Sequence, residues 1–82
     1  MENEYKIYIN IRISISKEGL VAPISFEWVD GRVFDVDKVL DRQKRTSNVG
    51  SAEMRYTCKI KGKEIFLFQD FDGRWYIEKK VG

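Results

Sequence analysis

Histidine is absent from this chain of 82 residues, and cysteine occurs only once, as Cys58. Without histidine, neither a Ser-His-Asp triad nor a Cys-His nucleophile pair can be assembled, and nearly all zinc sites are excluded. A single cysteine cannot form an internal disulfide, which is typical of proteins in a reducing compartment. We therefore predict a non-enzymatic protein with no catalytic residues, no bound metal and no cofactor.

Long apolar segments are also missing. The longest apolar run has four residues, Ile65–Phe68, whereas a membrane-spanning helix needs about 20. The acidic start, Met1–Glu4, contains no apolar stretch of the kind found in secretory signals. These features predict a cytoplasmic protein without a membrane partner. A chain of this length is expected to form one domain, residues 1–82, with a thin core and little room for an enclosed small-molecule site.

Strict alternation marks the first segment of the chain. Apolar residues occupy every second position from Tyr5 to Ile15, and most of them are isoleucine. β-Branched side chains suit a pleated strand, whereas a helix would scatter them around its circumference. The segment Tyr5–Ser16 is therefore predicted to form one long strand, which is bent or coiled because strands usually have only about 5–6 residues.

An Asp-Gly step at residues 30–31 predicts a hairpin, and the apolar pattern decides its register. A two-residue loop would place carboxylates on the apolar face of the strand pair. A three-residue loop that ends in a left-handed glycine pairs Trp28 with Arg32 and Phe26 with Phe34, so that apolar side chains stay together. The same interpretation of the Asp-Gly step at residues 72–73 gives a second hairpin, with the pairs Phe68–Tyr76 and Leu67–Ile77.

The middle of the chain is less regular. The adjacent apolar residues Val39 and Leu40 predict a bulge or a strand buried on both faces. Residues 42–52 are mostly polar, which predicts a frayed strand end and a mobile loop. A short helix capped by Asp37 is the alternative for this region.

A tight turn is expected around Gly62. If residues 62–63 form a type II′ turn, Ile60 pairs with Ile65 in the next strand. Six antiparallel strands then follow one another without a convincing helix. Because several strands are apolar on both faces, we predict an all-β meander that closes into an SH3-like or related small β-barrel, or packs as two orthogonal halves.

The chain resembles a family of short bacterial proteins found in Firmicutes. The resemblance covers about residues 24–78 and depends on the motif W-V-D-G-R-V-F-D-V-D-K-V-L-D-R at residues 28–42, then R-Y-T-C at 55–58, L-F at 67–68 and R-W-Y at 74–76. A looser similarity extends to small actinobacterial proteins whose genes lie near error-prone DNA polymerases. The resemblance implies a shared fold, but no reaction and no catalytic residues.

Three carboxylates, Asp35, Asp37 and Asp41, would share a face if their strand were regular. Such a group could suggest metal or acid-base chemistry, but side chains along one strand face are about 7 Å apart and do not converge on a ligand. We interpret them as a solvated surface. Cys58 falls in the apolar register, opposite Leu67 or Ile65, and is interpreted as an inert core thiol.

The two tryptophans, Trp28 and Trp75, allow two interpretations. Each lies beside a hairpin turn, where it could bind a ligand at an open end of the barrel, and each also fits an alternating core pattern. We favour the core for both, with Arg32 stacked on Trp28 as a cation–π contact.

Charge is unevenly distributed along the chain: residues 42–63 carry a net charge of +6, and the remainder carries −4. Such asymmetry can mark a surface for nucleic acid or for an acidic protein, although basic patches are often only solvated. Tyr8 or Phe66 could supply aromatic stacking next to this basic region. The candidate nucleic-acid-binding residues are Arg42, Lys44, Arg45, Arg55, Lys59, Lys61 and Lys63.

The sequence thus predicts a binding or accessory module whose partner is nucleic acid or a nucleic-acid enzyme. The alternative is a protein–protein interaction module or homodimer, which acts through an unpaired edge strand over Tyr5–Ser16.

Overall fold

The computed structural model describes residues 4–46 and 50–80, and every regular element in these ranges is a β-strand. Among these residues there is no helix long and apolar enough to cross a membrane. The strands are β1 (Glu4–Tyr8), β2 (Asn10–Ile15), β3 (Val21–Glu27), β4 (Val33–Asp35), β5 (Lys38–Thr46), β6 (Ala52–Ile60), β7 (Lys63–Gln69) and β8 (Trp75–Lys80).

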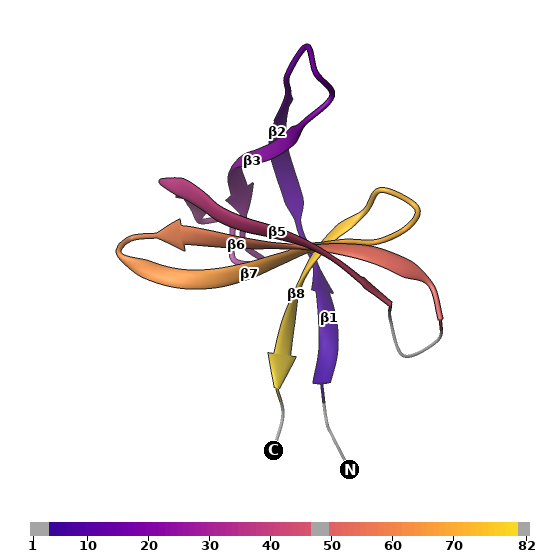
Figure 1. Cartoon of the computed structure of the whole chain (residues 1–82). Coiled ribbons are helices and arrows are strands. Elements are labelled where there is room, and N and C mark those ends of the chain that lie inside the picture. Colours follow the sequence, from indigo (N-terminus) through magenta and orange to yellow (C-terminus); the bar gives the residue numbers. More distant parts are fainter. Residues whose placement is uncertain (1–3, 47–49, 81–82) are drawn as a thin grey trace.

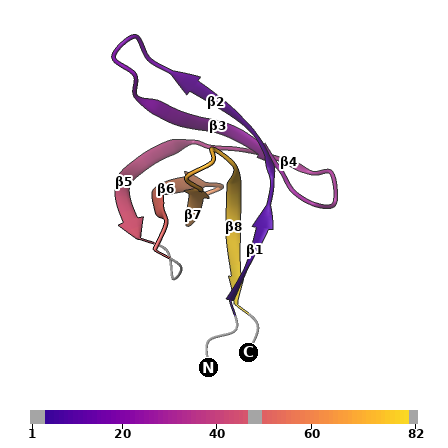
Figure 2. The same cartoon turned by 90° about the vertical axis from the view of Figure 1, so that its right-hand side faces the viewer.

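The strands form two antiparallel sheets. The larger sheet has the order β1-β8-β7-β6-β5, and the smaller has the order β2-β3-β4. The larger sheet is strongly twisted, since β5–β7 run across the view in Figure 1 whereas β1 and β8 run up and down it. The smaller sheet lies over one end of the larger one, and its β2–β3 hairpin projects beyond it (Figure 2). The predicted all-β, antiparallel architecture is confirmed at this level.

The chain passes between the sheets at two corners. At the first, the Ile9 N–H still donates to the Trp75 carbonyl of β8 at 3.0 Å before the chain enters β2. At the second, the N–H of Val36 donates to Ile24 in the smaller sheet, and the N–H of Asp37 donates to Lys59 in the larger, both at 2.8 Å. The predicted strand Tyr5–Ser16 is therefore two strands.

The count of six strands is wrong, because both corners divide a segment that looked continuous in sequence. Within the described residues the two sheets do not close into a barrel. One reason is that β7 and β8 pair only at Phe68–Tyr76 and Gln69–Trp75 and then diverge. The predicted pair of Leu67 with Ile77 is consequently not formed. The SH3-like barrel is thus not confirmed, and the observed fold is an open packing of two sheets.

The main core lies between the sheets. Alternation places the side chains of Tyr56 and Cys58 on the face of the larger sheet that is turned toward the smaller one, which we call the inner face. Burying side chains of this size contributes about 1.5–3 kcal/mol each. The cluster comprises Phe26, Tyr56, Cys58, Ile60, Leu67 and Trp75, all at most 4% exposed.

A second, smaller core lies on the opposite face of the larger sheet, which we call the outer face. Phe68 and Tyr76 pair across β7 and β8, and their rings stack with centroids 5.0 Å apart. The Tyr76 hydroxyl donates a 2.8 Å hydrogen bond to Glu53, a carboxylate that is itself buried. Burial and this carboxylate together raise the pKa of Tyr76.

Both Asp-Gly hairpins adopt the predicted three-residue loops. In the first, the Trp28 N–H donates to Arg32 at 2.8 Å, Gly31 has a φ of 90°, and Phe26 pairs with Phe34. In the second, the Asp70 N–H donates to the Arg74 carbonyl at 2.7 Å. The register predicted from apolar pairing is thus present at both turns.

The turn between β6 and β7 differs from the prediction. Its two loop residues are Lys61 and Gly62, with φ of 52° and 79°, so the turn is of the I′ kind and Ile60 pairs with Lys63 instead of Ile65. A left-handed lysine is unusual, but its N–H donates a 3.1 Å hydrogen bond to the Asp37 carboxylate. This long-range contact, invisible in the local sequence, selects the register.

The predicted loop over residues 42–52 is also wrong in its first part. The bulge at Leu40 is confirmed, because the pairing passes from Val39–Cys58 to Asp41–Thr57, but β5 then continues to Thr46. An edge strand needs few apolar side chains, so its polar composition resembled that of a loop. Residues 47–49 lie outside the described ranges, and β6 begins at Ala52. Among the described residues no helix is capped by Asp37.

Replacing Gly31 with alanine is expected to lower the free energy of unfolding by about 1 kcal/mol, because a Cβ is strained in the left-handed region. No atom lies within 4 Å of that Cβ, so the loss reports backbone strain and not a clash. Urea unfolding followed by circular dichroism measures the change. Gly31→Asn is the control and should lose less, since asparagine tolerates this conformation. Equal stability of the alanine variant and the wild type would contradict the assigned turn.

Cys58 generates a pH prediction. The thiol is fully buried and pairs with Ile65, as expected for a core residue, and burial raises its pKa from 9.0 to about 11. Because the unfolded chain loses this proton first, the thiol's contribution to stability is complete below pH 9 and is lost as the pH rises to about 11, by on the order of 2 kcal/mol.

Unfolding free energies measured from neutral pH to pH 11 test this decline. The Cys58→Ala variant should decline less steeply, even though its cavity lowers its stability at every pH. Native Cys58 should also react slowly with thiol reagents. Parallel pH profiles of the two proteins would show that Cys58 does not titrate as described.

Candidate nucleic-acid interface

The seven predicted basic residues do not form one patch. Residues that pair across β5 and β6 share a face, so Arg42 and Lys44 lie on the inner face with Tyr56 and Met54. By the same alternation, Arg45, Arg55 and Lys59 lie on the outer face, while Lys61 is in the turn and Lys63 begins β7. The charge excess along the sequence is thus divided between two surfaces.

Three of the seven candidate residues, Arg42, Arg45 and Arg55, are held by contacts within the protein. Arg42 donates from Nε to the Val21 carbonyl at 3.2 Å and so links the two sheets. Arg55 donates to the Gln43 amide oxygen at 2.7 Å and covers the ring of Phe66. These contacts explain much of the positive charge as packing of the sheet itself.

Arg45 completes the outer core. Its guanidinium lies 5.0 Å from the centroid of the Phe68 ring, and its Nε is 3.6 Å from the buried carboxylate of Glu53. Glu53 therefore has two partners, the Tyr76 hydroxyl and Arg45. A buried carboxylate is costly unless it is paired in this way, so Arg45 has a structural role.

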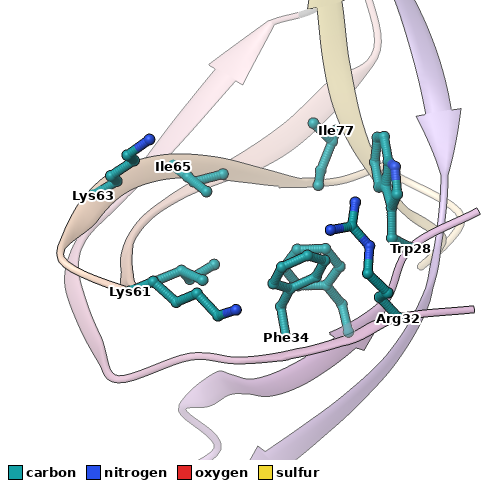
Figure 3. Close-up of a pocket in the computed structure, with 9 residues that line it drawn as sticks. Trp28, Arg32, Phe34, Lys61, Lys63, Ile65 and Ile77 are labelled. Atoms are coloured by element: carbon teal, nitrogen blue, oxygen red, sulfur yellow. The ribbon is translucent and has the colours of Figure 1, made fainter. Parts of the chain in front are cut away.

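A cleft of about 450 Å³ lies between the two sheets and is shown in Figure 3. It opens where β7 and β8 diverge, so that Ile65 and Ile77 line it from separate strands. The turn at Lys61 and the first hairpin complete its sides. The lining residues are Phe26, Trp28, Arg32, Phe34, Ile60, Lys61, Lys63, Ile65 and Ile77.

The cleft combines an apolar floor with a cationic rim. Phe26 and Phe34 stack in its floor with ring centroids 5.4 Å apart. The Arg32 guanidinium and the Lys61 ammonium group lie 5.3 and 5.2 Å from the centroid of the Phe34 ring. Lys63 adds a third cation, and no acidic residue is among those that line the cleft.

The rim cations differ in their partners. Arg32 is 2.7 Å from the carboxylate of Asp30, and the Arg32 backbone N–H, followed by its guanidinium, holds the pKa of that carboxyl below its usual value. Lys61 and Lys63 form no ion pair with any residue in the described ranges. Two lysines with unneutralised charge therefore stand at the mouth of an apolar recess.

The aromatic predictions have a mixed outcome. Trp75 is buried in the inter-sheet core, as predicted, whereas Trp28 is half-buried and lines the cleft. The predicted stacking of Arg32 on Trp28 is wrong, because the Arg32 guanidinium lies over the ring of Phe34 instead. Phe66 and Tyr8, the proposed stacking residues, are 45% and 39% exposed, but on the outer face they are covered by Arg55 and Arg74.

The three aspartates do not converge. Asp35 belongs to the smaller sheet, Asp37 to the corner, and Asp41 to the larger sheet beyond the bulge. Among the residues that the structure describes, no group of three acidic or sulfur ligands could hold a metal ion.

Comparison with known protein families, curated proteins and solved structures finds no match for this chain. The resemblance to the Firmicutes proteins stays a prediction.

Because Arg45 has a structural role, its replacement should destabilise the protein more than replacement of the neighbouring Lys44. Arg45→Ala should lower the free energy of unfolding by about 1–3 kcal/mol, because it leaves the Glu53 carboxylate buried with one partner. Lys44→Ala is the matched control: Lys44 is exposed on the other face, and its loss should change stability by about 0.5 kcal/mol or less. Thermal and urea unfolding measure both. Equal effects would show that Arg45 is only a surface charge.

Proposed function

We propose that this protein is a non-catalytic module that binds single-stranded nucleic acid at the cleft between its sheets. The observation that carries the proposal is the composition of the cleft lining: aromatic and aliphatic side chains on the floor, Arg32, Lys61 and Lys63 at the rim, and no carboxylate. A nucleotide has the complementary chemistry, because its base is planar and its phosphate is anionic.

Each part of the cleft suits one part of a nucleotide. The exposed part of Trp28 offers a surface for a base beside the stacked rings of Phe26 and Phe34, and stacking on such a ring contributes about 1–3 kcal/mol per base. Lys61 and Lys63 lie beside this recess and would contact the phosphates that flank the base. A volume of about 450 Å³ falls within the range of ordinary ligand sites.

A recess of this kind favours unpaired bases. In a duplex the base faces are stacked within the helix and cannot enter a cleft without being extruded. Sequence-tolerant recognition of single strands commonly combines a basic surface with aromatic stacking, which is the combination present here. The free, buried thiol of Cys58 agrees with a reducing, cytoplasmic location for this activity.

Of the basic residues in the region 42–63, the proposal assigns contact with nucleic acid only to the two lysines that line the cleft. Arg42, Arg45 and Arg55 already contact groups of the protein itself, so their loss would weaken the fold before it weakened binding. Lys61 and Lys63 are the members of the region that line the cleft, and Arg32 joins them from outside it. Lys59 lies on the outer face, away from the proposed ligand.

A fluorescence-anisotropy titration with labelled single strands of about 12 nucleotides tests the proposal. Between about 50 and 200 mM salt, affinity should fall with a logarithmic slope of about −0.7 for each phosphate contact. The Lys61→Ala/Lys63→Ala variant should bind more weakly and with a slope flatter by about 1–2 units. A duplex of the same sequence should bind less tightly than the single strand.

Lys59→Ala is the matched control, since it removes the same charge from the outer face and should leave affinity nearly unchanged. Trp28→Phe should remove the fluorescence change on binding, because the remaining Trp75 is buried. Absence of binding to any single strand at low salt would refute the proposal. So would an equal loss from Lys59→Ala and Lys61→Ala, which would indicate nonspecific attraction to the net charge.

A further inference from the structure

The outer edge of β2 carries no neighbouring strand among the described residues. The smaller sheet has the order β2-β3-β4, so β2 pairs only with β3. The hairpin of β2 and β3 projects from the body of the protein in both views (Figures 1 and 2). An unpaired strand edge in this position is open to another strand.

The hydrogen-bond pattern shows which residues face that edge. The Ser16 N–H donates to Leu20 at 2.9 Å, and the Ser16 carbonyl accepts from Gly19 at 2.8 Å, so the backbone of Ser16 points toward β3. Alternation along the strand then turns the backbone groups of Ile11, Ile13 and Ile15 outward.

The pairing within the hairpin agrees with this assignment. Ile13 lies opposite Pro23, which has no N–H to donate. The register shifts between Arg12, which pairs with Ser25, and Ile13, which pairs with Pro23. The extra residue, Ile24, belongs to β3, so β2 itself stays regular. Its outward N–H and C=O groups are therefore spaced as in an ordinary strand.

The side chains on this edge are apolar and lack the usual protection. Ile11 packs against the core, but Ile13 is 36% and Ile15 is 65% exposed on the same face. β2 contains no proline, glycine or lysine, which are the residues that commonly block edge pairing. Its one charged side chain, Arg12, points to the other face.

We propose that two copies of the protein associate through β2, as an antiparallel pair with a two-fold axis at Ile13. In this register Ile13 faces Ile13 of the second copy, and Ile11 faces Ile15 of the second copy. All the outward backbone groups of these isoleucines are then hydrogen-bonded, and the two smaller sheets become one continuous sheet. The exposed isoleucines form a single apolar strip on one face of it.

Charge and geometry favour a second copy as the occupant of this edge. With the axis at Ile13, Arg12 lies opposite Ser14 of the second copy, whereas an axis at Arg12 would oppose two arginines. An axis at Ser14 would leave Ile11 opposite Lys17 of the second copy. The added strand is already formed in its own hairpin, so association does not require a disordered peptide to fold.

This self-association goes beyond the proposed nucleic-acid binding and does not depend on it. No residue of β2 lines the cleft. The cleft is near the end of β3, at Phe26 and Trp28, while the exposed isoleucines are near its beginning at Val21. Two copies would carry two separate clefts, which would increase the affinity for one long strand of nucleic acid.

Sedimentation equilibrium of the full chain, from about 10 μM to about 1 mM, tests the proposal. The wild type should show a dimer whose fraction rises with concentration. Ile15→Lys should raise the dissociation constant at least tenfold, because it places a charge in the apolar strip. Val33→Lys is the matched control: Val33 is 64% exposed on β4, at the opposite edge of the same sheet, and its change should leave the dimer intact.

Amide hydrogen exchange keeps the proposal testable if the lysine variant does not fold. In the wild type, the amides of Ile11, Ile13 and Ile15 should be protected at high concentration and lose protection on dilution. A protein that is monomeric at every concentration would overturn the proposal. A dimer in which these amides exchange freely, or one that Val33→Lys disrupts as strongly as Ile15→Lys, would overturn it as well.

Discussion

Asp37 anchors the chain to the larger sheet at the corner where it leaves the smaller one. Its N–H donates to the Lys59 carbonyl, and its carboxylate accepts the Lys61 N–H at 3.1 Å, so one residue binds both the end of β6 and the turn that follows. The preceding residue, Val36, is still bonded to Ile24 in the smaller sheet. The chain therefore changes sheets within one peptide unit, and this corner holds Phe34 and Lys61 on facing sides of the cleft.

The sequence predicts correctly those features that depend on contacts between residues close together in the chain. The first hairpin is settled by residues within a few positions of one another, namely a glycine at positive φ and the facing pair Phe26–Phe34, and its register could be predicted. The turn at Lys61 depends on Asp37, which is 24 positions away, and could not. A local rule that favours glycine at the left-handed position gives the wrong register when a distant carboxylate stabilises a lysine there.

The corners and the outer core were missed for related reasons. A strand that passes from one sheet to another keeps its alternation, so nothing in the isoleucine pattern marks the break at Ile9. The pair Phe68–Tyr76 follows from the second Asp-Gly hairpin and could be predicted, but the buried Glu53 beside it lies on β6, 23 positions from Tyr76. Nothing in the local sequence distinguishes this carboxylate from an exposed one.

In the candidate site, too, the sequence shows the charge excess but not the contacts of the individual side chains. The excess of positive charge in residues 42–63 is real, but the arginines and lysines in it behave differently. Arginine has a planar group that can lie over a ring and also contact an oxygen atom, and Arg42, Arg45 and Arg55 all do so within the protein. The oxygen belongs to a backbone carbonyl for Arg42, to a carboxylate for Arg45 and to a side-chain amide for Arg55. Lysine is a more strongly hydrated point charge, and Lys61 and Lys63 remain at the surface. Identifying the residues available to a ligand therefore required their contacts.

The two exposed apolar regions arise from one mismatch between the sheets. The smaller sheet is offset along the larger one, so its β2–β3 hairpin extends past the core at one end of β3. At the other end of β3, the divergence of β7 and β8 leaves Phe34 and Ile65 partly uncovered. Among the residues that the structure describes, no further element covers either region. The two regions differ in chemistry and therefore suit different ligands. At the cleft, apolar side chains adjoin unneutralised lysines, which suits a molecule that is both planar and anionic. At the hairpin, apolar side chains adjoin unpaired backbone donors and acceptors, a combination that only another strand can satisfy in full.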